Sequence, residues 1–171
     1  MHCGRFKNNV KIIDDRLFEG SIVDQVDEVM EFIYKHINVG FVISGKPCRD
    51  EIWDYPRDAL REAVINAVCH RDYSDTADIQ IKIFDDHIQA WNPGPLPFGI
   101  TLEELYQPTH SSKPRNKLIA QIFYDLGLIE RYGSGIQRMI NACIEAGLPE
   151  PVFEEDAKAL HRENKSADYP N

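Results

Sequence analysis

Residues 56–73 read PRDALREAVINAVCHRDY, and this stretch decides the fold. Pro56 suits the first turn of a helix, where an N–H donor has no partner, and no second helix breaker follows before His70. We therefore predict one helix over residues 57–70. Apolar side chains recur along it at helical spacing, which predicts a face packed in the core: Leu60, Val64, Ala67 and Val68.

A second row of the same helix is polar, because Glu62, Asn66 and His70 follow one another at intervals of four residues. A carboxylate, an amide and an imidazole in one row offer a proton acceptor, an oxygen ligand and a titratable group. Small alanines lie beside Glu62 and Asn66, which favours partial burial. On spacing alone a solvated helix face is the commoner explanation, so both interpretations stay open at this point.

The segment before this helix predicts a second core helix. Residues 21–37 carry apolar side chains at helical spacing, with Ser21 or Asp24 as the N-cap. Residues 39–44 then predict a short strand. Residues 50–55 predict an extended approach to the central helix, because the residue before a proline avoids the helical region.

The segment after the central helix predicts a β-hairpin. Residues 77–84 alternate isoleucines with polar side chains, Asp85 and Asp86 form the turn, and residues 87–91 return antiparallel. Helices and strands in this order predict an α/β (α+β) fold, a two-layer sandwich with helices on one face of a mixed or antiparallel sheet. The hairpin leads into NPGPLP, residues 92–97, which we call the NPG loop.

Residues 101–105, TLEEL, fit a short helix with a capping box. The polar loop after it, residues 107–117, reads QPTHSSKPRNK. Ser111, Lys113 and Arg115 are candidate donors to phosphate, in a loop that closes over a nucleotide. A solvated surface loop explains the same composition equally well.

Two further helices are predicted in the C-terminal third. Residues 116–127 form the first, with apolar side chains that we expect to face the core: Leu118, Ile119, Ile122, Phe123 and Leu126. Gly133 and Gly135 open the second, over residues 136–147. Such glycines let backbone N–H groups converge on an anion at the positive end of the helix dipole, although they can also only relieve packing.

Four stretches resemble one known family: REAVINAVCHRDY, WNPGPLP, ERYGSGIQRM and GLPEPVF. Glu62 and Asn66 match the E-x-x-x-N pattern of the GHKL ATPases, such as gyrase B, Hsp90, histidine kinases and MutL. From about Cys3 to Phe153 the chain more closely resembles the C-terminal domain of the RecG-like ATP-dependent helicase and transcriptional-regulator group. There a GHKL-like domain follows an AlbA-type, Schlafen-like DNA-binding domain. The resemblance implies a GHKL (Bergerat) fold that binds ATP and Mg²⁺.

The resemblance also implies roles for single residues. Asn66 would ligate Mg²⁺, and Glu62 would orient or deprotonate the water that attacks the phosphate. Asn92 would meet the adenine, and Gly94 would leave room for it. The remaining candidates would contact or neutralise the phosphates: Arg71, Ser111, Lys113, Arg115, Gly133 and Gly135.

The NPG loop departs twice from the D-x-G-x-G pattern of the superfamily. Asn92 replaces an aspartate that accepts a hydrogen bond from the adenine amino group, and Leu96 replaces the second glycine. An asparagine oxygen accepts the same bond without charge, and so more weakly. Both departures favour an alternative, a non-catalytic GHKL scaffold that serves as a regulatory or dimerisation module of a transcriptional regulator. The retention of Glu62 and Asn66 together favours the ATPase.

The composition bears on partners. The formal net charge of -9 at pH 7 disfavours direct DNA binding, so DNA would be reached only through a domain missing from this chain. The four cysteines include no C-x-x-C pair, and neither a signal peptide nor a membrane-spanning apolar run is present. We therefore expect a cytoplasmic protein that acts through a protein partner or as a homodimer.

The chain is expected to divide into three parts. Residues 1–20 would be the closing strand and linker of a missing N-terminal DNA-binding domain. Residues 21–153 would form the nucleotide-binding domain. Residues 154–171 are polar and poor in apolar side chains, which predicts a disordered tail.

Overall fold

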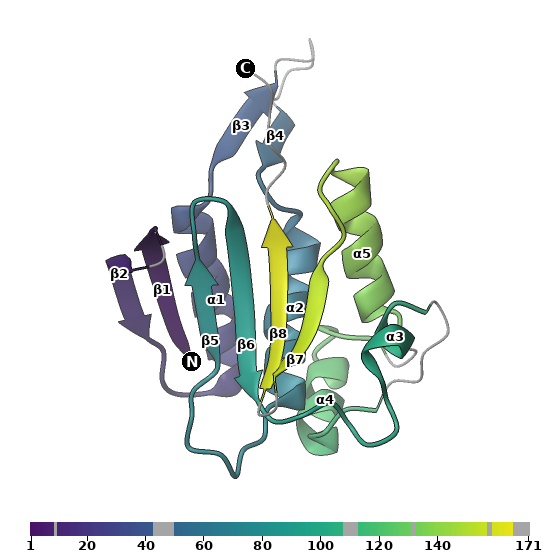
Figure 1. The fold of residues 1–171 in the computed structure, drawn as a ribbon. Helices are drawn as coiled ribbons and strands as arrows, with labels where there is room; N and C mark the ends of the chain where they lie inside the picture. Colours follow the sequence, from purple (N-terminus) through teal and green to yellow (C-terminus); the bar gives the residue numbers. More distant parts are fainter. Residues whose placement is uncertain (9, 43–49, 108–112, 131–132, 157–158, 166–171) are drawn as a thin grey trace.

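The computed structural model describes residues 1–8, 10–42, 50–107, 113–130, 133–156 and 159–165. Its main sheet has six strands in the order β2-β1-β5-β6-β8-β7. Helices α1 (Ile22–His36) and α2 (Arg57–His70) lie behind this sheet, and α5 (Gly135–Glu145) packs beside α2, which gives the predicted two-layer architecture (Figure 1). The strands are β1 His2–Lys7, β2 Lys11–Leu17, β5 Gln80–Ile83, β6 His87–Pro93, β7 Val152–Asp156 and β8 Ala159–Lys165.

The sheet is mixed, as expected. Strand β1 runs parallel to β5, whereas β2 is antiparallel to β1 and β6 is antiparallel to β5. The isoleucines at positions 79, 81 and 83 are all buried, which confirms the predicted alternation. The helical layer lies against this buried side of the sheet.

Both ends of the chain differ from the expected division. Residues 1–20 contribute β1 and β2 to the same sheet, and the amino group of Met1 donates to the backbone oxygen of Phe18 at 2.7 Å. Residues 154–156 continue β7, and β8 follows, antiparallel to both β6 and β7. Strand pairing therefore orders part of the tail, although its composition predicted disorder.

Helices α1 (Ile22–His36) and α2 (Arg57–His70) form as the sequence predicts. The hydroxyl of Ser21 caps α1 by accepting from the N–H of Val23 at 3.3 Å. Pro56 stands at the start of α2. The predicted core face of α2 is confirmed, since all four of its side chains are buried: Leu60, Val64, Ala67 and Val68.

Strands β3 (Val39–Val42) and β4 (Asp50–Trp53) form a separate antiparallel hairpin, which projects beyond the main sheet (Figure 1). Its base is anchored to the helical layer. The guanidinium of Arg57 lies 4.6 Å from the ring centre of Tyr34 and 5.4 Å from that of Trp53. This contact joins the hairpin to α1 and to the beginning of α2.

Three shorter helices complete the layer: α3 (Leu102–Leu105), α4 (Lys117–Asp125) and α5 (Gly135–Glu145). The capping box of α3 is confirmed, because Glu104 N donates to Thr101 Oγ1 at 3.3 Å and Thr101 N donates to Glu104 Oε2 at 2.9 Å. Helix α5 begins at Gly135, one residue before the predicted start.

The predicted inward face of α4 is wrong in part. Phe123 is buried, but Leu118 is 75% exposed, Ile122 41% and Leu126 54%. Apolar residues surround most of this short helix, so their spacing fits more than one face. The helix packs through Phe123 and Ala120 instead.

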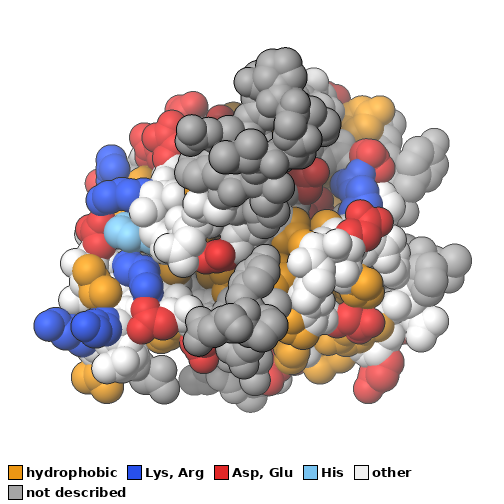
Figure 2. Space-filling view, turned by 90° about the horizontal axis from the view of Figure 1, so that it is seen from above, with side chains coloured by type: hydrophobic (Ala, Val, Ile, Leu, Met, Phe, Trp, Pro, Cys, Tyr) orange, Lys and Arg blue, Asp and Glu red, His pale blue; other side chains and the backbone are white. Residues whose placement is uncertain are grey.

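Figure 2 views the molecule from above, at right angles to Figure 1. Lys and Arg side chains gather mainly on the left of this face, with acidic side chains beside them. Charges of both signs are thus mixed there. Within the described ranges, no helix is both long and apolar enough to cross a membrane.

Candidate functional site

A cavity lies between the middle of α2, the NPG loop and the beginning of α5, where Glu62, Asn66, Asn92 and Gly135 all line it. Its volume is about 90 Å³. Ligand pockets usually measure roughly 300 Å³ or more. A nucleotide would therefore have to displace some of the side chains that line the cavity.

Glu62 and Asn66 form the polar wall that α2 gives to this cavity. The Asn66 Nδ2 amide donates to Glu62 Oε1 at 2.8 Å. This bond orients the Asn66 side chain, because the opposite orientation would place its oxygen against a carboxylate. Asn66 Oδ1 makes no hydrogen bond to the residues that the structure describes. Glu62 and Asn66 are both partly buried, as the neighbouring alanines predicted, and both line the cavity.

Gly135 is the first residue of α5 and lies against Glu62. A Cβ atom added at residue 135 would overlap the Glu62 carboxylate, so a larger residue there would push that carboxylate aside. The N-cap residue Ser134 makes no side-chain cap, and its hydroxyl donates to Glu130 Oε2 at 3.0 Å. A carboxylate thus lies beside the N-terminus of α5, the end of a helix that attracts anions.

Arg138 is a site residue that the sequence analysis did not single out. Its Nη2 lies 3.5 Å from Glu62 Oε2, and its Nη1 lies 2.6 Å from Glu130 Oε1. One guanidinium therefore bridges two carboxylates at the wall of the cavity. Its position three residues after Gly135, on the helix that the glycines open, is the signal that could have indicated it.

The NPG loop supplies the opposite wall. Asn92 is only 2% exposed and lines the cavity, and its amide donates weakly to Pro93 O at 3.4 Å. Leu96 lines the cavity as well. Gly94 has a φ of +109°, and a Cβ there would lie 2.9 Å from the Cβ of Asp72. Gly94 therefore permits contact with Asp72, rather than opening the cavity floor as expected.

Comparison with known families adds to this geometry. The family model described as "Putative ATP-dependent DNA helicase recG C-terminal" matches residues 76–161. The chain belongs to this family. The matched range includes the NPG loop and both glycines of the α5 start, but it begins after the end of α2, so the assignment of Glu62 and Asn66 rests on their geometry.

One solved structure similar to this member of the RecG C-terminal family is the crystal structure of the DIP2311 protein from Corynebacterium diphtheriae. The two chains are 25% identical and superpose with a TM-score of 0.85 over 98% of the present chain. The match covers 34% of the DIP2311 chain, so the present chain spans about a third of that protein's length. No curated protein matches the chain.

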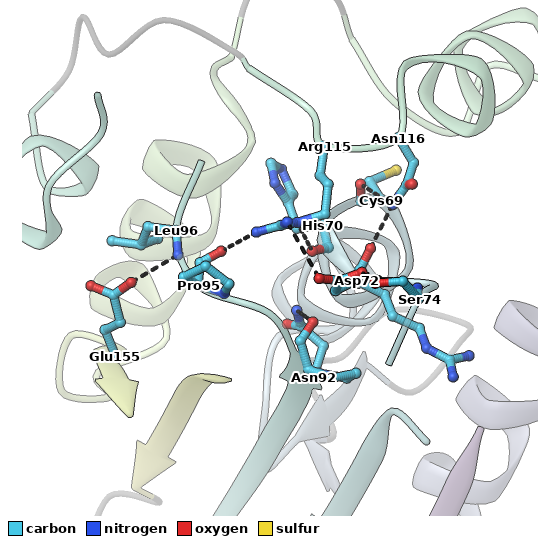
Figure 3. Close-up of polar contacts among 12 residues, drawn as sticks. Cys69, His70, Asp72, Ser74, Asn92, Pro95, Leu96, Arg115, Asn116 and Glu155 are labelled. Carbon is cyan, nitrogen blue, oxygen red and sulfur yellow. Dashed lines mark hydrogen bonds and ion pairs between the residues drawn. The ribbon is translucent and has the colours of Figure 1, made fainter. Parts of the chain in front are cut away.

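Arg115 holds the NPG loop of this RecG C-terminal domain against the end of α2 (Figure 3). Its Nε donates to His70 O at 3.1 Å, and its Nη2 donates to Pro95 O at 2.5 Å. Asp72 Oδ2 lies 3.8 Å from Nη1. These contacts occupy the guanidinium, so Arg115 connects two segments of backbone rather than facing the cavity.

Arg71, another expected phosphate contact, is also engaged elsewhere. Its Nη2 donates to Ala77 O at 2.8 Å, and its guanidinium lies 4.9 Å from the ring centre of Tyr73. It is not among the described residues that line the cavity. Arg71 instead fixes the turn that follows α2.

Two other expected contacts do reach the cavity. Lys113, whose side chain is exposed, lines it from the 107–117 loop. Gly133 lines it beside the start of α5, with a φ of +72° that favours glycine. Ser111 lies outside the described residues. The structure thus gathers Glu62, Asn66, Asn92, Lys113, Gly133 and Gly135 around one cavity and leaves Arg71, Gly94 and Arg115 outside it.

The cavity has its own electrostatic character. Cys69 lines it, and burial, with a smaller effect of the Glu62 charge, raises the pKa of its thiol to about 12. The thiol is therefore neutral at physiological pH and is no nucleophile. Among the described residues, no group of three or more His, Cys, Asp and Glu could hold a metal ion.

Proposed function

We propose that this RecG C-terminal domain binds an adenine nucleotide with Mg²⁺ in the cavity between α2 and α5, and that Glu62 directs its hydrolysis. The observation that carries the proposal is the arrangement of Glu62, Asn66 and Gly135. A carboxylate and an amide project from one helix face toward the glycine-opened N-terminus of another helix. Phosphate, metal and attacking water all require such groups within a few ångströms of one another.

The donor set suits Mg²⁺. This ion prefers oxygen ligands and is usually held by one or two protein oxygens, with phosphates and water completing its shell. Asn66 Oδ1 is such an oxygen, and it is oriented by the bond between Nδ2 and Glu62 Oε1. Bound Mg²⁺ would neutralise phosphate charge.

The remaining cavity residues have complementary tasks. Asn92 would accept from the adenine amino group through Oδ1, because its amide hydrogens face Pro93 O. Backbone N–H groups around Gly133 and Gly135 would bind phosphate, and Lys113 would neutralise part of its charge. Glu62 would accept a proton from the attacking water or orient it.

The wider setting is also a proposal. We assign the chain to a helicase-related or transcriptional-regulator protein of the cytoplasm, in which DNA contact belongs to another domain. The net charge of -9 supports this division, since a DNA-binding surface is normally basic. A protein partner or a second copy of the chain would then respond to nucleotide binding.

Calorimetric titration of the purified chain with a non-hydrolysable ATP analogue, with and without Mg²⁺, tests the proposal. We expect micromolar binding that weakens without Mg²⁺ and in Asn66→Ala. Asn141→Ala is a matched control, because Asn141 is exposed on α5 and bonds only Gln137 among the described residues. The absence of heat at millimolar nucleotide would refute nucleotide binding.

A second candidate function is a non-catalytic scaffold for regulation or dimerisation. Two observations favour it: Leu96 lines the cavity, and the cavity is small. Glu62→Ala separates the two candidates. An ATPase would lose phosphate release while it kept nucleotide binding and its fold, whereas a scaffold would show no phosphate release with either chain.

A further inference from the structure

Arg138 lies where two cavities meet. Glu62, Ile65 and Arg138 line both the cavity of the proposed nucleotide site and a second cavity on the outer side of α2 and α5. The ion pair between Glu62 and Arg138 therefore forms part of the wall between them. Arg138 is 45% exposed, so its side chain has room to change partner.

Arg138 carries one positive charge and faces two negatively charged side chains. Its guanidinium faces two carboxylates, Glu62 at 3.5 Å and Glu130 at 2.6 Å, and Ser134 donates to the second of them. The longer contact is the one that faces the cavity. At this distance and exposure the pair with Glu62 is weak, so an anion of higher charge can replace it.

Glu62 itself stands where an anion is favoured. Its carboxylate fills the space left by the missing Cβ of Gly135, beside the N-terminus of α5. Two groups contact it there, the amide of Asn66 and the guanidinium of Arg138. In the structure, the Glu62 carboxylate therefore occupies the surroundings that suit a phosphate group.

We infer that Arg138 binds the terminal phosphate of a nucleoside triphosphate, and that it exchanges the Glu62 carboxylate for that phosphate when the nucleotide binds. The inference rests on the proposed function, which places Glu62 beside the water that attacks this phosphate. Because Arg138 contacts Glu62, the phosphate nearest to it is the one at which hydrolysis takes place. A guanidinium pairs with phosphate through two parallel hydrogen bonds.

The chemical consequence is a preference for triphosphate over diphosphate. A diphosphate lacks the terminal group, so Arg138 would stay with Glu62 and Glu130. The contact would also release Glu62 to act on water only when a triphosphate is present. Binding of a triphosphate to Arg138 would thus free Glu62 to direct hydrolysis.

The test compares two ligands in three chains. The affinities of a non-hydrolysable ATP analogue and of ADP, both with Mg²⁺, are measured calorimetrically for the wild type, Arg138→Gln and Arg138→Lys. We expect Arg138→Gln to lower the affinity for the ATP analogue about tenfold and to change that for ADP less than about twofold. Arg138→Lys should recover part of the loss, because it keeps the charge but not the paired hydrogen bonds.

Arg61→Gln is the matched control, because Arg61 pairs with Asp27 at 3.0 Å and lines the second cavity but not the first. It should leave both affinities unchanged. If Arg138→Gln weakens both ligands equally, or neither, Arg138 does not read the terminal phosphate and the inference is wrong, while the proposed function stands. If the wild type binds neither ligand, the proposed function fails, and the inference with it.

Discussion

The carboxylate of Glu62 occupies the space that the Cβ of any residue other than glycine would fill at position 135. Two helices far apart in the sequence therefore meet here through the Glu62 side chain and the backbone of residue 135. This contact places the candidate base at the N-terminus of α5. Glu62 can take this position only while residue 135 is glycine.

Gly135→Ala should displace the Glu62 carboxylate from Asn66 and Arg138, and so lower the stability of the domain by about 1 kcal/mol. An alanine at an ordinary helix position would instead stabilise relative to glycine. Urea unfolding of Gly135→Ala, Glu62→Ala and the double variant measures the coupling between the two sites. Glu62→Ala should remove most of the loss, because it removes the side chain that overlaps the new Cβ. An equal loss in both backgrounds would place the conflict elsewhere.

Arg115→Gln should destabilise the domain by about 2 kcal/mol, because it removes donors to the backbone oxygens of His70 and Pro95. Any loss of nucleotide affinity should be similar for triphosphate and diphosphate, since Arg115 does not face the cavity. Thermal unfolding and titration with both nucleotides check this. Lys117→Gln, an exposed neighbour, is the control and should change neither quantity. A selective loss of triphosphate binding would make Arg115 a phosphate contact after all.

Asp72 should make the domain sensitive to acid. Hydrogen bonds from Ser74, first from its hydroxyl and then from its backbone N–H, lower the pKa of Asp72 below its ordinary value of 3.8. The folded state therefore binds this proton less readily than the unfolded state. The stabilisation is present above pH 3.8 and is lost as the pH falls toward the lower folded value. Urea midpoints of wild type and Asp72→Asn should thus differ at pH 6, and the difference should shrink as the pH falls from 3.8 toward the lower folded pKa. A constant difference would contradict the assignment.

Asn92→Asp restores the charge that the superfamily pattern carries, but it should destabilise the domain without ligand. Asn92 is 2% exposed, and a carboxylate buried there costs about 2 kcal/mol or more at pH 7. The deficit should shrink at acidic pH, where the carboxyl group is protonated. It should also shrink with an ATP analogue, whose amino group donates to the new side chain. Denaturation with and without the analogue at both pH values measures this, and a variant as stable as the wild type would show that the side chain reaches water.

Local patterns predicted α2 well, because a proline start and a single apolar face are properties of adjacent residues. The same helix fixed the spacing of Glu62 and Asn66, so this half of the site followed from the sequence. Arg138 did not, since its partner Glu62 lies 76 residues away and only the packing of α5 on α2 brings the two together. The exposed face of α4 was missed for a related reason. An apolar side chain indicates that its burial is favourable, but it does not indicate which part of the protein will cover it.

The roles expected for the arginines show a second limit. Arg71 and Arg115 carry guanidinium groups of the kind that bind phosphate, but both donate to backbone oxygens instead. A guanidinium serves either purpose equally well, and sequence does not tell which acceptor is within reach. The same holds for Gly94, whose missing Cβ faces Asp72 rather than the ligand.

Strand β8 lies between β6 and β7, and within the main sheet β7 pairs only with β8. A shortened chain that ended after residue 156 would therefore lose more than its last strand. It would leave β7 without a partner and uncover the edge of β6, whose free N–H and C=O groups would recruit strands of other molecules. For anyone who prepares this domain, residues 159–165 should therefore be kept, because their strand covers the edges of both β6 and β7.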